Sequence, residues 1–470
     1  MIRFILNQKE ISTALPPGTL LLDFIRYHEQ LKGTKIGCRE GDCGACTILT
    51  GELKDGKLLY TSATSCLMAI GNAQGKHIVT IEGINLPELN VVQKAFSDEG
   101  ATQCGFCTPG FIVSLTGFCM NAEEPRYERA VKSIDGNICR CTGYKSIERA
   151  AQKVNDFLSQ RNKTDALQFA VDNNIIPEYF LKIEERILKM QGEEDKKINP
   201  RAKLLGGGTD LYVQQHETMP AEEIVFLFDR KDLKGISKSG NTCEMGAGAT
   251  VTDIAESPVF IEHFPDLPKY MRLISSTQIR NMATVGGNLT NASPIGDLTI
   301  LFLALDALLI LKNGSKKRNI SLKDFYKGYK VLDKHPEEII EKISFELPGK
   351  ESLFNFEKVS KRTHLDIATV NTAIFLTVKE NTITLAHLSA GGVGPIPAYL
   401  SKSSEFLKGK EVTQAIVQKL IEIAQTEITP ISDARGTASY KRLLLSQLMK
   451  AHFITLFPEK QLQNLISINA

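Results

Sequence analysis

Eight of the ten cysteines fall in two groups within the first 141 residues, and their thiols are the side chains best suited to chemistry. No secretory signal is visible at the N-terminus, so we expect a cytoplasmic, reducing environment in which disulfides are uncommon. Metal binding is then the leading explanation for these cysteines.

The first group consists of Cys38, Cys43, Cys46 and Cys66. Its spacing, C-x4-C-x2-C with a distant fourth cysteine, is typical of a plant-type 2Fe–2S cluster. Gly37, Gly41 and Gly44 lie within the same segment, where they allow positive φ and leave backbone N–H groups free to face sulfur atoms. A zinc site is the alternative, although this spacing is unusual for zinc.

The second group consists of Cys104, Cys107, Cys139 and Cys141. It joins a C-x2-C pair to a C-x-C pair, and C-x2-C pairs also serve zinc sites and redox dithiols. We expect Thr108 to cap a helix that has Pro109 at its first position, and a second helix to follow Gly143. Four thiols at helix ends can hold a second iron–sulfur cluster or a zinc ion. Cys119 and Cys243 are interpreted as buried packing residues, and the eight histidines as surface or core residues.

Two glycine-rich segments follow, at residues 204–211 and 284–288. Such loops can bring backbone N–H groups against phosphate oxygens. Neither contains the G-x-G-x-x-G pattern of a dinucleotide-binding turn, and each alone is compatible with a plain turn. Two of them beside an iron–sulfur module favour nucleotide or flavin binding.

The predicted secondary structure that positions these residues changes along the chain. Residues 1–85 alternate as short strands, including a hairpin predicted to turn at Asp55-Gly56, and residues 86–158 follow a helical pattern. The charged stretch 192–197 is interpreted as a solvated linker. The last hundred residues predict two strands, Ile367–Val378 and Thr382–Ser389, and then two helices.

Composition limits the class of protein. The chain has 470 residues, 42% of them hydrophobic and 23% charged, as expected for a globular protein of several α/β and α+β domains. The formal net charge of +2 gives no electrostatic reason to expect nucleic acid or an anionic membrane as partner. The longest apolar run, Thr299–Leu311, is too short to span a bilayer, which needs about 20 residues.

In order, the motifs GCREGDCGAC, QCGFC, GNICRCTGY, LLGGGTDL, ATVGGNL and ASPIGD resemble the xanthine dehydrogenase branch of the molybdenum hydroxylases. The resemblance implies five segments: a β-grasp plant-type ferredoxin domain at 1–85, a helical-bundle 2Fe–2S domain at 86–160, a linker at 161–200, a vanillyl-alcohol-oxidase-type FAD domain at 201–350 and a C-terminal α+β domain at 351–470. Larger family members continue into a molybdopterin domain. The chain therefore resembles the iron–sulfur and FAD subunit of a two-chain enzyme.

The resemblance also implies roles for individual residues. The first cysteine group would ligate the cluster nearer FAD, and the second the cluster nearer molybdenum, with Gln103 facing the pterin in the partner chain. Residues that would contact FAD are Leu204, Leu205, Gly206, Gly207, Gly208, Thr209, Asp210, Leu211, Thr284, Val285, Gly286, Gly287, Asn288, Asp297, Ile340 and Lys358. On the acceptor side the candidates are Tyr329, Arg362 and Asp366, and Leu365 stands where the family pattern has an acidic residue.

The implied function is that of the electron-transfer subunit of an NAD-dependent xanthine dehydrogenase. A large molybdopterin-binding partner would hydroxylate the purine, two 2Fe–2S clusters would relay the electrons to FAD, and FAD would pass a hydride to NAD⁺. No side chain of this subunit needs to act as a general acid or base, and the family implies a dimer of heterodimers. The alternatives are the same subunit of an aldehyde- or N-heterocycle-oxidising relative, and a non-enzymatic electron carrier or zinc module.

Overall fold

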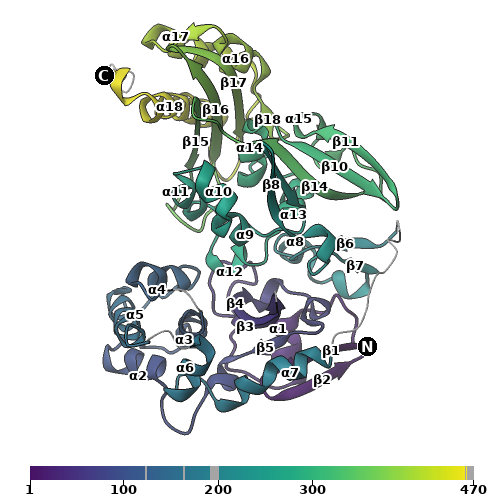
Figure 1. Ribbon diagram of the computed structural model, residues 1–470, viewed down its shortest axis with the longest axis vertical. Helices are drawn as coiled ribbons and strands as arrows, with labels where there is room; N and C mark the ends of the chain where they lie inside the picture. The colour runs from purple at the N-terminus through teal and green to yellow at the C-terminus, as the bar shows by residue number, and fades with distance from the viewer. Residues whose placement is uncertain are drawn as a thin grey trace. The chain divides into compact units, whose positions relative to one another are not determined.

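The computed structural model describes residues 1–54, 56–121, 124–161, 165–190, 199, 201–460 and 462. The chain forms two compact units (Figure 1). The first combines Met1–Phe228 with Ser276–Ala283, and the second combines Asp229–Ser275 with Thr284–Ala470. The predicted linker at 192–197 and Asp55 of the predicted turn lie outside the described residues.

The first unit begins with a five-stranded sheet in the order β2-β1-β5-β3-β4. Its strands are β1 (Ile2–Leu6), β2 (Lys9–Thr13), β3 (Thr47–Lys54), β4 (Lys57–Thr64) and β5 (His77–Val79). Strands β1 and β2 form one antiparallel hairpin, and β1 runs parallel to β5. Strands β3 and β4 form a second antiparallel hairpin, which confirms the hairpin predicted around Asp55-Gly56. Phe4, Ile48 and Ile78 are fully buried in the core of this sheet, which gives it a rigid base.

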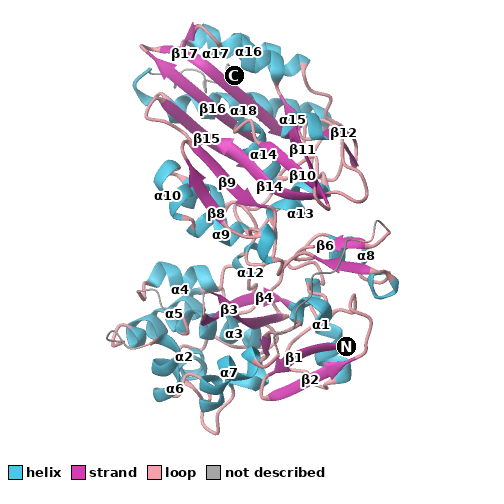
Figure 2. Cartoon of the chain, turned by 45° about the vertical axis from the view of Figure 1, so that its right-hand side comes forward, coloured by secondary structure: helices cyan, strands magenta, loops and turns pink. Residues whose placement is uncertain are grey.

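Helices follow the sheet, as predicted for residues 86–158. They are α2 (Val91–Asp98), α3 (Thr108–Cys119), α4 (Tyr127–Ser133) and α5 (Lys145–Leu158). Asn90 caps α2 through a reciprocal capping box with Gln93. Helix α3 differs slightly from expectation, because Cys107 occupies the N-cap position and Thr108 is already helical. Figure 2 shows the four helices grouped together. Their apolar faces pack around Phe111 and Ile147.

Residues 166–188 differ from the expected linker. They form α6 (Ala166–Asp172), a 3-10 turn at Glu178–Lys182 and α7 (Ile183–Leu188). Phe180 is fully buried and packs against Tyr60 and His77, and the Tyr179 hydroxyl donates to the Gly83 carbonyl at 2.9 Å. Burial of these aromatic side chains makes the segment part of the first unit.

Two further strands and two further helices belong to the first unit. The parallel strands β6 (Lys203–Leu205) and β7 (Ile224–Phe226) enclose helix α8 (Leu211–Gln215) in the sequence. Helix α12 (Thr277–Arg280) belongs to the segment Ser276–Ala283, which returns to the first unit from within the sequence of the second.

The second unit contains a five-stranded sheet in the order β11-β10-β14-β9-β8. Its strands are β8 (Ile236–Ser239), β9 (Thr242–Gly246), β10 (Leu308–Asn313), β11 (Lys316–Ser321) and β14 (Ile339–Glu346). Short helices accompany it: α9 (Val251–Glu256), α10 (Pro258–His263), α11 (Leu267–Arg272), α13 (Val285–Asn291), α14 (Asp297–Ala304) and α15 (Leu322–Phe325). A small ribbon, β12 (Tyr326–Gly328) with β13 (Val331–Leu332), stands apart from the sheet.

The C-terminal part of the second unit is an α+β arrangement. Its strands are β15 (Ser352–Val359), β16 (Val370–Lys379), β17 (Thr382–Gly391), β18 (Ala398–Tyr399) and β19 (Lys410–Glu411), and its helices are α16 (Ser401–Leu407), α17 (Gln414–Thr426) and α18 (Ala438–Leu456). The predicted turn between β16 and β17 is confirmed, with Glu380 and Asn381 at φ of 48° and 67°. Helix α18 packs on β15 and β16 (Figure 2). Among the described residues, no helix combines the length and apolar character that crossing a membrane requires.

Candidate iron–sulfur and flavin sites

The β3–β4 hairpin brings distant cysteines of the first group together. Cys46 immediately precedes β3 and Cys66 lies just after β4, in the 3-10 turn Ser65–Leu67. Because Thr47 pairs with Thr64 at the open end of this hairpin, the two cysteines meet there, and their thiols form a hydrogen bond. Both cysteines are only 2% exposed, so this part of the site is closed to solvent.

Cys38 and Cys43 form the other half of the first group, in the loop before β3. The backbone N–H groups of Glu40 and Cys43 donate to the Cys38 sulfur at 3.3 and 3.4 Å. The hydrogen bond from the Cys43 thiol and these backbone N–H groups lower the pKa of Cys38 to about 5, and the same shared proton raises the pKa of Cys43. Thiolate is the form that binds metal, and N–H groups directed at sulfur stabilise it.

Glycine is required where this loop folds back on itself. Gly44 has a φ of 68°, and a Cβ atom there would lie 2.3 Å from the Gly136 carbonyl oxygen. A Cβ atom on Gly37 would lie 2.6 Å from the Cys43 sulfur. A side chain at either position would push the loop away from the geometry that presents its sulfurs.

The substitution Gly44→Ala tests this requirement. We expect it to lower occupancy of the first cluster strongly, because the positive φ costs about 1–2 kcal/mol for an L-residue and the clash adds to that cost. Gly56→Ala is the matched control, since Gly56 also has a positive φ of 75° but no atom lies within 4 Å of its Cβ position. Iron per chain is the measurement, and equal iron content in both variants would contradict the prediction.

The second cysteine group lies where α3 and α5 begin. The Cys141 and Cys104 sulfurs are 3.6 Å apart, and the Cys107 and Cys139 thiols form a hydrogen bond. The backbone N–H groups of Cys141 and Thr142 donate to the Cys139 sulfur at 3.5 Å. Burial opposes ionisation of Cys139, but these N–H groups and the Thr142 hydroxyl outweigh it and lower its pKa.

In both groups the four sulfurs therefore approach as two pairs. Among the described residues, no three His, Cys, Asp or Glu side chains are grouped to hold one metal ion together. A 2Fe–2S cluster with four cysteine ligands needs two thiolates on each of two irons. The donor set and its pairing fit two such clusters.

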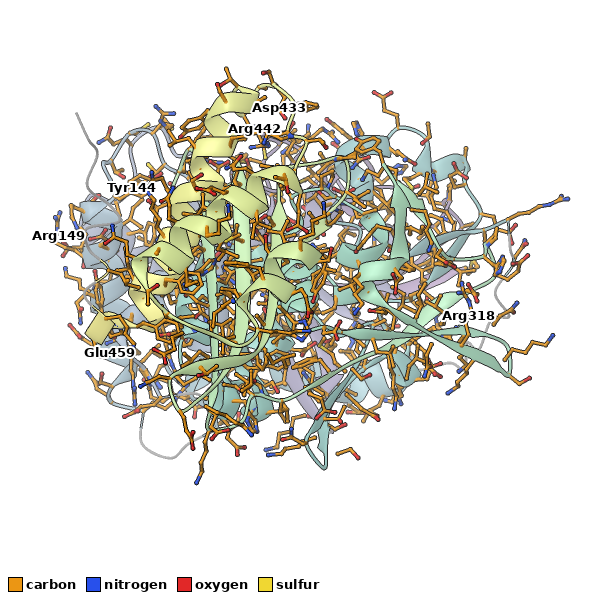
Figure 3. The ribbon with its side chains drawn as sticks, turned by 90° about the horizontal axis from the view of Figure 1, so that it is seen from above. Tyr144, Arg149, Arg318, Asp433, Arg442 and Glu459 are labelled. Carbon is orange, nitrogen blue, oxygen red and sulfur yellow. The ribbon has the colours of Figure 1, made fainter. Side chains whose placement is uncertain are left out.

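The surroundings of the two groups differ in exposure. Cys104, Cys141 and Gln103 are exposed, and Phe106 and Tyr144 are 47% and 40% exposed. Figure 3 labels the Tyr144 side chain. The Tyr144 hydroxyl accepts a hydrogen bond from the Cys139 backbone N–H at 3.1 Å, which holds the C-x-C loop in place. Cys104 and Cys141 of the second group thus face solvent, whereas Cys139 of that group is buried, as are Cys46 and Cys66 of the first.

The glycine loop at 204–211 connects β6 to α8 in the first unit. A Cβ atom on Gly207 would lie 1.8 Å from the Met282 carbonyl oxygen, and Gly208 has a φ of 83°. The Asn72 side chain donates to the Gly206 carbonyl at 3.0 Å. Only glycine fits at Gly207 and Gly208, so the loop is a tight, partly buried strand–loop–helix connection. Glycine-rich loops of this kind can bring backbone N–H groups against phosphate oxygens.

The second glycine segment, 284–288, begins α13 in the second unit. The Thr284 hydroxyl caps the helix by accepting from the Gly287 N–H at 3.2 Å, and Gly286 donates to the Ala247 carbonyl at 2.8 Å. A Cβ atom on Gly286 would meet Ala247 at 2.9 Å. The Asn288 side chain accepts from the Thr299 N–H and hydroxyl at 3.2 and 3.1 Å, which fixes the loop against α14.

Two predicted flavin contacts of the second unit come together in an ion pair. Lys358 Nζ lies 2.7 Å from Asp297 Oδ2 and donates to the Leu273 carbonyl at 2.7 Å, and its side chain is 1% exposed. Asn371 donates to the other Asp297 oxygen at 2.6 Å. The sequence gives no signal for Asn371, because a single asparagine within an apolar strand belongs to no motif. Ile340, another predicted contact, is buried in β14.

The acceptor-side candidates occupy two elements of the second unit. Tyr329 lies between β12 and β13 and is 64% exposed. Arg362 donates from its backbone N–H to Asp366 at 2.8 Å. Burial opposes ionisation of Asp366, but the N–H groups of Arg362 and Ile367 outweigh it and lower its pKa. Leu365 has a φ of 52°, so this loop holds a non-glycine residue in the left-handed region.

Models of four known domain families match consecutive segments of the chain. Residues 4–70 match the 2Fe-2S iron-sulfur cluster binding domain, and residues 80–152 match the [2Fe-2S] binding domain. Residues 188–348 match the FAD binding domain in molybdopterin dehydrogenase, and residues 356–456 match the CO dehydrogenase flavoprotein C-terminal domain. These matches support the molybdenum hydroxylase family. The chain is an iron–sulfur and flavin module of that kind.

Individual relatives agree with this assignment. Xanthine dehydrogenase of Emericella nidulans is 30% identical over 480 residues, which cover 88% of this chain and 35% of the relative. Aldehyde oxidase 2 of Macaca fascicularis is 26% identical over 540 residues, covering 100% and 40%. A chain of carbon monoxide dehydrogenase from Hydrogenophaga pseudoflava that lacks the Mo-pyranopterin moiety superimposes with a TM-score of 0.52 at 25% identity, covering 55% of this chain and 91% of that one. This molybdenum hydroxylase module spans little more than a third of the curated relatives.

Proposed function

We propose that this chain carries electrons in an NAD-dependent xanthine dehydrogenase, from a molybdenum centre through two 2Fe–2S clusters to FAD and then to NAD⁺. The observation that carries the proposal is the arrangement of the eight cysteines as pairs, with backbone N–H groups directed at their sulfurs. When bound, the clusters supply one-electron transfer and FAD supplies exchange between one-electron and hydride chemistry. The protein supplies ligands, spacing and the hydrogen bonds that set the potentials.

Different residues of the chain would bind each cofactor. Cys38, Cys43, Cys46 and Cys66 would hold the first cluster, and Cys104, Cys107, Cys139 and Cys141 the second. The glycine loops at 204–211 and 284–288 would each contact the FAD phosphates through backbone N–H groups, and Lys358, Asp297 and Ile340 would line the flavin. Gln103 would face the pterin, and Tyr329, Arg362 and Asp366 would line the acceptor side.

We further propose a molybdopterin-binding partner at the second cluster. Cys104, Cys141, Phe106 and Tyr144 are exposed there, so the cluster would be open to an electron donor. A dimer of heterodimers in the cytoplasm is the assembly that the resemblance implies. Mass photometry of the complex measures the assembly, and a single copy of each chain would contradict the dimer.

Cofactor content tests the proposal most directly. Protein purified without oxygen is expected to contain about four irons and four acid-labile sulfides per chain, since each 2Fe–2S cluster has two of each, and about one FAD. Reduction of the bound flavin by NADH would support NAD as the acceptor. Zinc in place of iron, with no flavin, would instead support a structural module and overturn the proposal.

A second candidate function is the same role in an aldehyde- or N-heterocycle-oxidising enzyme. The similarity to aldehyde oxidase 2, which extends over the whole chain, supports this second candidate. The substrate site lies with molybdenum, so the two candidates differ only in the complete enzyme. Turnover of xanthine against an aromatic aldehyde by that enzyme decides between them.

A further inference from the structure

A single backbone hydrogen bond links the two cysteine groups. The Cys43 carbonyl oxygen accepts from the Ile138 N–H at 3.0 Å, and Ile138 is followed directly by Cys139. Cys43 belongs to the first group and Cys139 to the second. A continuous path of covalent bonds and one hydrogen bond therefore joins a sulfur of one group to a sulfur of the other.

A buried asparagine holds the two loops at this link. Asn137, 5% exposed, donates to the Gly44 carbonyl at 3.0 Å and to the Thr47 hydroxyl at 3.2 Å. Its own side-chain oxygen accepts from the Ser114 hydroxyl at 2.8 Å, and Ser114 lies on α3. Asn137 thus ties the first cysteine loop, the second cysteine loop and α3 together.

Gln278 completes this network from α12. Its Nε2 donates to the Asn137 side-chain oxygen at 3.0 Å and to the Ser114 hydroxyl at 3.1 Å, and the residue is 1% exposed. Helix α12 is anchored by Asp135, which accepts from the Thr277 N–H at 2.7 Å and pairs with Arg280 at 2.5 Å. Gln278 therefore reaches the junction from a fixed helix.

The chain is closely packed where Gly44, Asn137 and Gln278 meet, and this packing restricts their movement. A Cβ atom on Gly136 would lie 1.8 Å from Gln278 Oε1, and one on Gly110 would lie 2.4 Å from the Gly44 carbonyl oxygen. Paired members of a buried polar network hold their surroundings in place. The paired groups here are the Gln278 amide nitrogen, Asn137 and Ser114, whereas the buried Gln278 oxygen has no hydrogen-bond partner among the described residues. A small displacement of Asn137 would be transmitted directly to the neighbouring Ile138 N–H.

We propose that Gln278 is a positioning residue for electron transfer between the two clusters, acting through Asn137 on the Cys43–Ile138 hydrogen bond. The inference rests on the proposed function, because it requires both clusters to be bound. In this step one electron leaves one iron–sulfur centre and enters the other, so one iron is oxidised as another is reduced. No bond breaks and no proton moves. Electron tunnelling is faster along bonds and hydrogen bonds than across gaps, so the alignment of this link sets the rate.

The test compares Gln278→Leu with Asn281→Ala in the cluster-loaded protein. Asn281 is the matched control, since it lies in the same returning segment but donates to the Ser62 carbonyl, at 2.8 Å, instead of to the Asn137 network. A flash-activated deazaflavin reductant would reduce the exposed second cluster first, and freeze-quench electron paramagnetic resonance would follow arrival of the electron at the first. Exchange of the Ile138 amide hydrogen would report the link itself.

We expect Gln278→Leu to slow transfer on the order of tenfold, the scale typical of losing an outer partner of a metal site. Iron content and both cluster signals would stay at wild-type levels, the Ile138 amide would exchange faster, and Asn281→Ala would behave as wild type. A wild-type transfer rate in Gln278→Leu would overturn the proposal.

If that variant loses a cluster, Gln278→Asn decides, because it keeps the amide but withdraws it from Asn137. Loss of a cluster in both variants would assign Gln278 to assembly and also overturn it, whereas a wild-type protein without two 2Fe–2S signals would contradict the proposed function instead.

Discussion

Replacing Cys66 with serine is expected to remove one of the two iron–sulfur clusters and leave the other in place. Cys66 is 2% exposed and shares a hydrogen bond with the Cys46 thiol at the open end of the β3–β4 hairpin. Its partner iron would lose half of its thiolate ligands, and serine oxygen is a poor substitute for a soft sulfur ligand. We expect iron to fall by about half, to two per chain, because each 2Fe–2S cluster contributes two.

The control for this prediction is Cys243→Ala. Cys243 is as buried as Cys66 but lies in β9 of the second unit and belongs to neither cysteine group. It should keep the full iron content and both sets of resonance signals. The prediction fails if Cys66→Ser retains the wild-type iron content, or if it loses all iron, since the second group has ligands of its own.

Removing the carboxylate of Asp297 is expected to destabilise the second unit and weaken flavin binding together. The change Asp297→Ala leaves Lys358, 1% exposed, without the carboxylate that lies 2.7 Å away. It also removes the shorter of the two hydrogen bonds that the Asn371 side chain donates, leaving the one to the Ile295 carbonyl at 3.3 Å. Breaking a buried pair by removing one partner costs about 3–5 kcal/mol. For a unit of this size, that corresponds to a fall in unfolding temperature of roughly 10 °C.

Thermal unfolding and the flavin content of the purified protein measure this effect. Glu422→Ala is the control, because it breaks an ion pair with Lys419 in the same unit whose side chains are 55% and 60% exposed, and such pairs contribute little. The double change Asp297→Leu with Lys358→Met should recover part of the lost stability, since it leaves no buried charge, but none of the flavin binding. Equal unfolding temperatures for Asp297→Ala and Glu422→Ala would show that the buried pair is not important for stability.

The local features of the candidate sites were predictable from the sequence, because ligand spacing and turn residues are local. The two N-terminal hairpins follow alternating patterns, and the β16–β17 turn follows from Asn381, which tolerates a positive φ. Spacing predicts two groups of four cysteines, but it does not predict the pairs within the second group, where Cys104 approaches Cys141 and Cys107 approaches Cys139. The pairing of Cys46 with Cys66 required only that the intervening segment form one hairpin.

The remainder depends on contacts between distant parts of the chain. Residues 161–200 were expected to be a linker, but α6 and α7 form within them. The burial of this segment depends on Phe180 and Ile183, which pack against the sheet formed much earlier in the chain. Gln278 carries no motif, and its role follows only from its contact with Asn137, more than a hundred residues away. A sequence pattern indicates which side chains are buried, but it does not identify the distant residues that they contact.

The return of residues Ser276–Ala283 to the first unit also bears on how the protein is made. Domains generally fold as they leave the ribosome, N-terminal part first. Here all eight cluster cysteines emerge early, yet Asn137, Ser114 and Asp135 obtain their last partners only after Ala283 has been synthesised. The first unit therefore stays incomplete until β8 and β9 of the second unit and the segment Ser276–Ala283 have been synthesised.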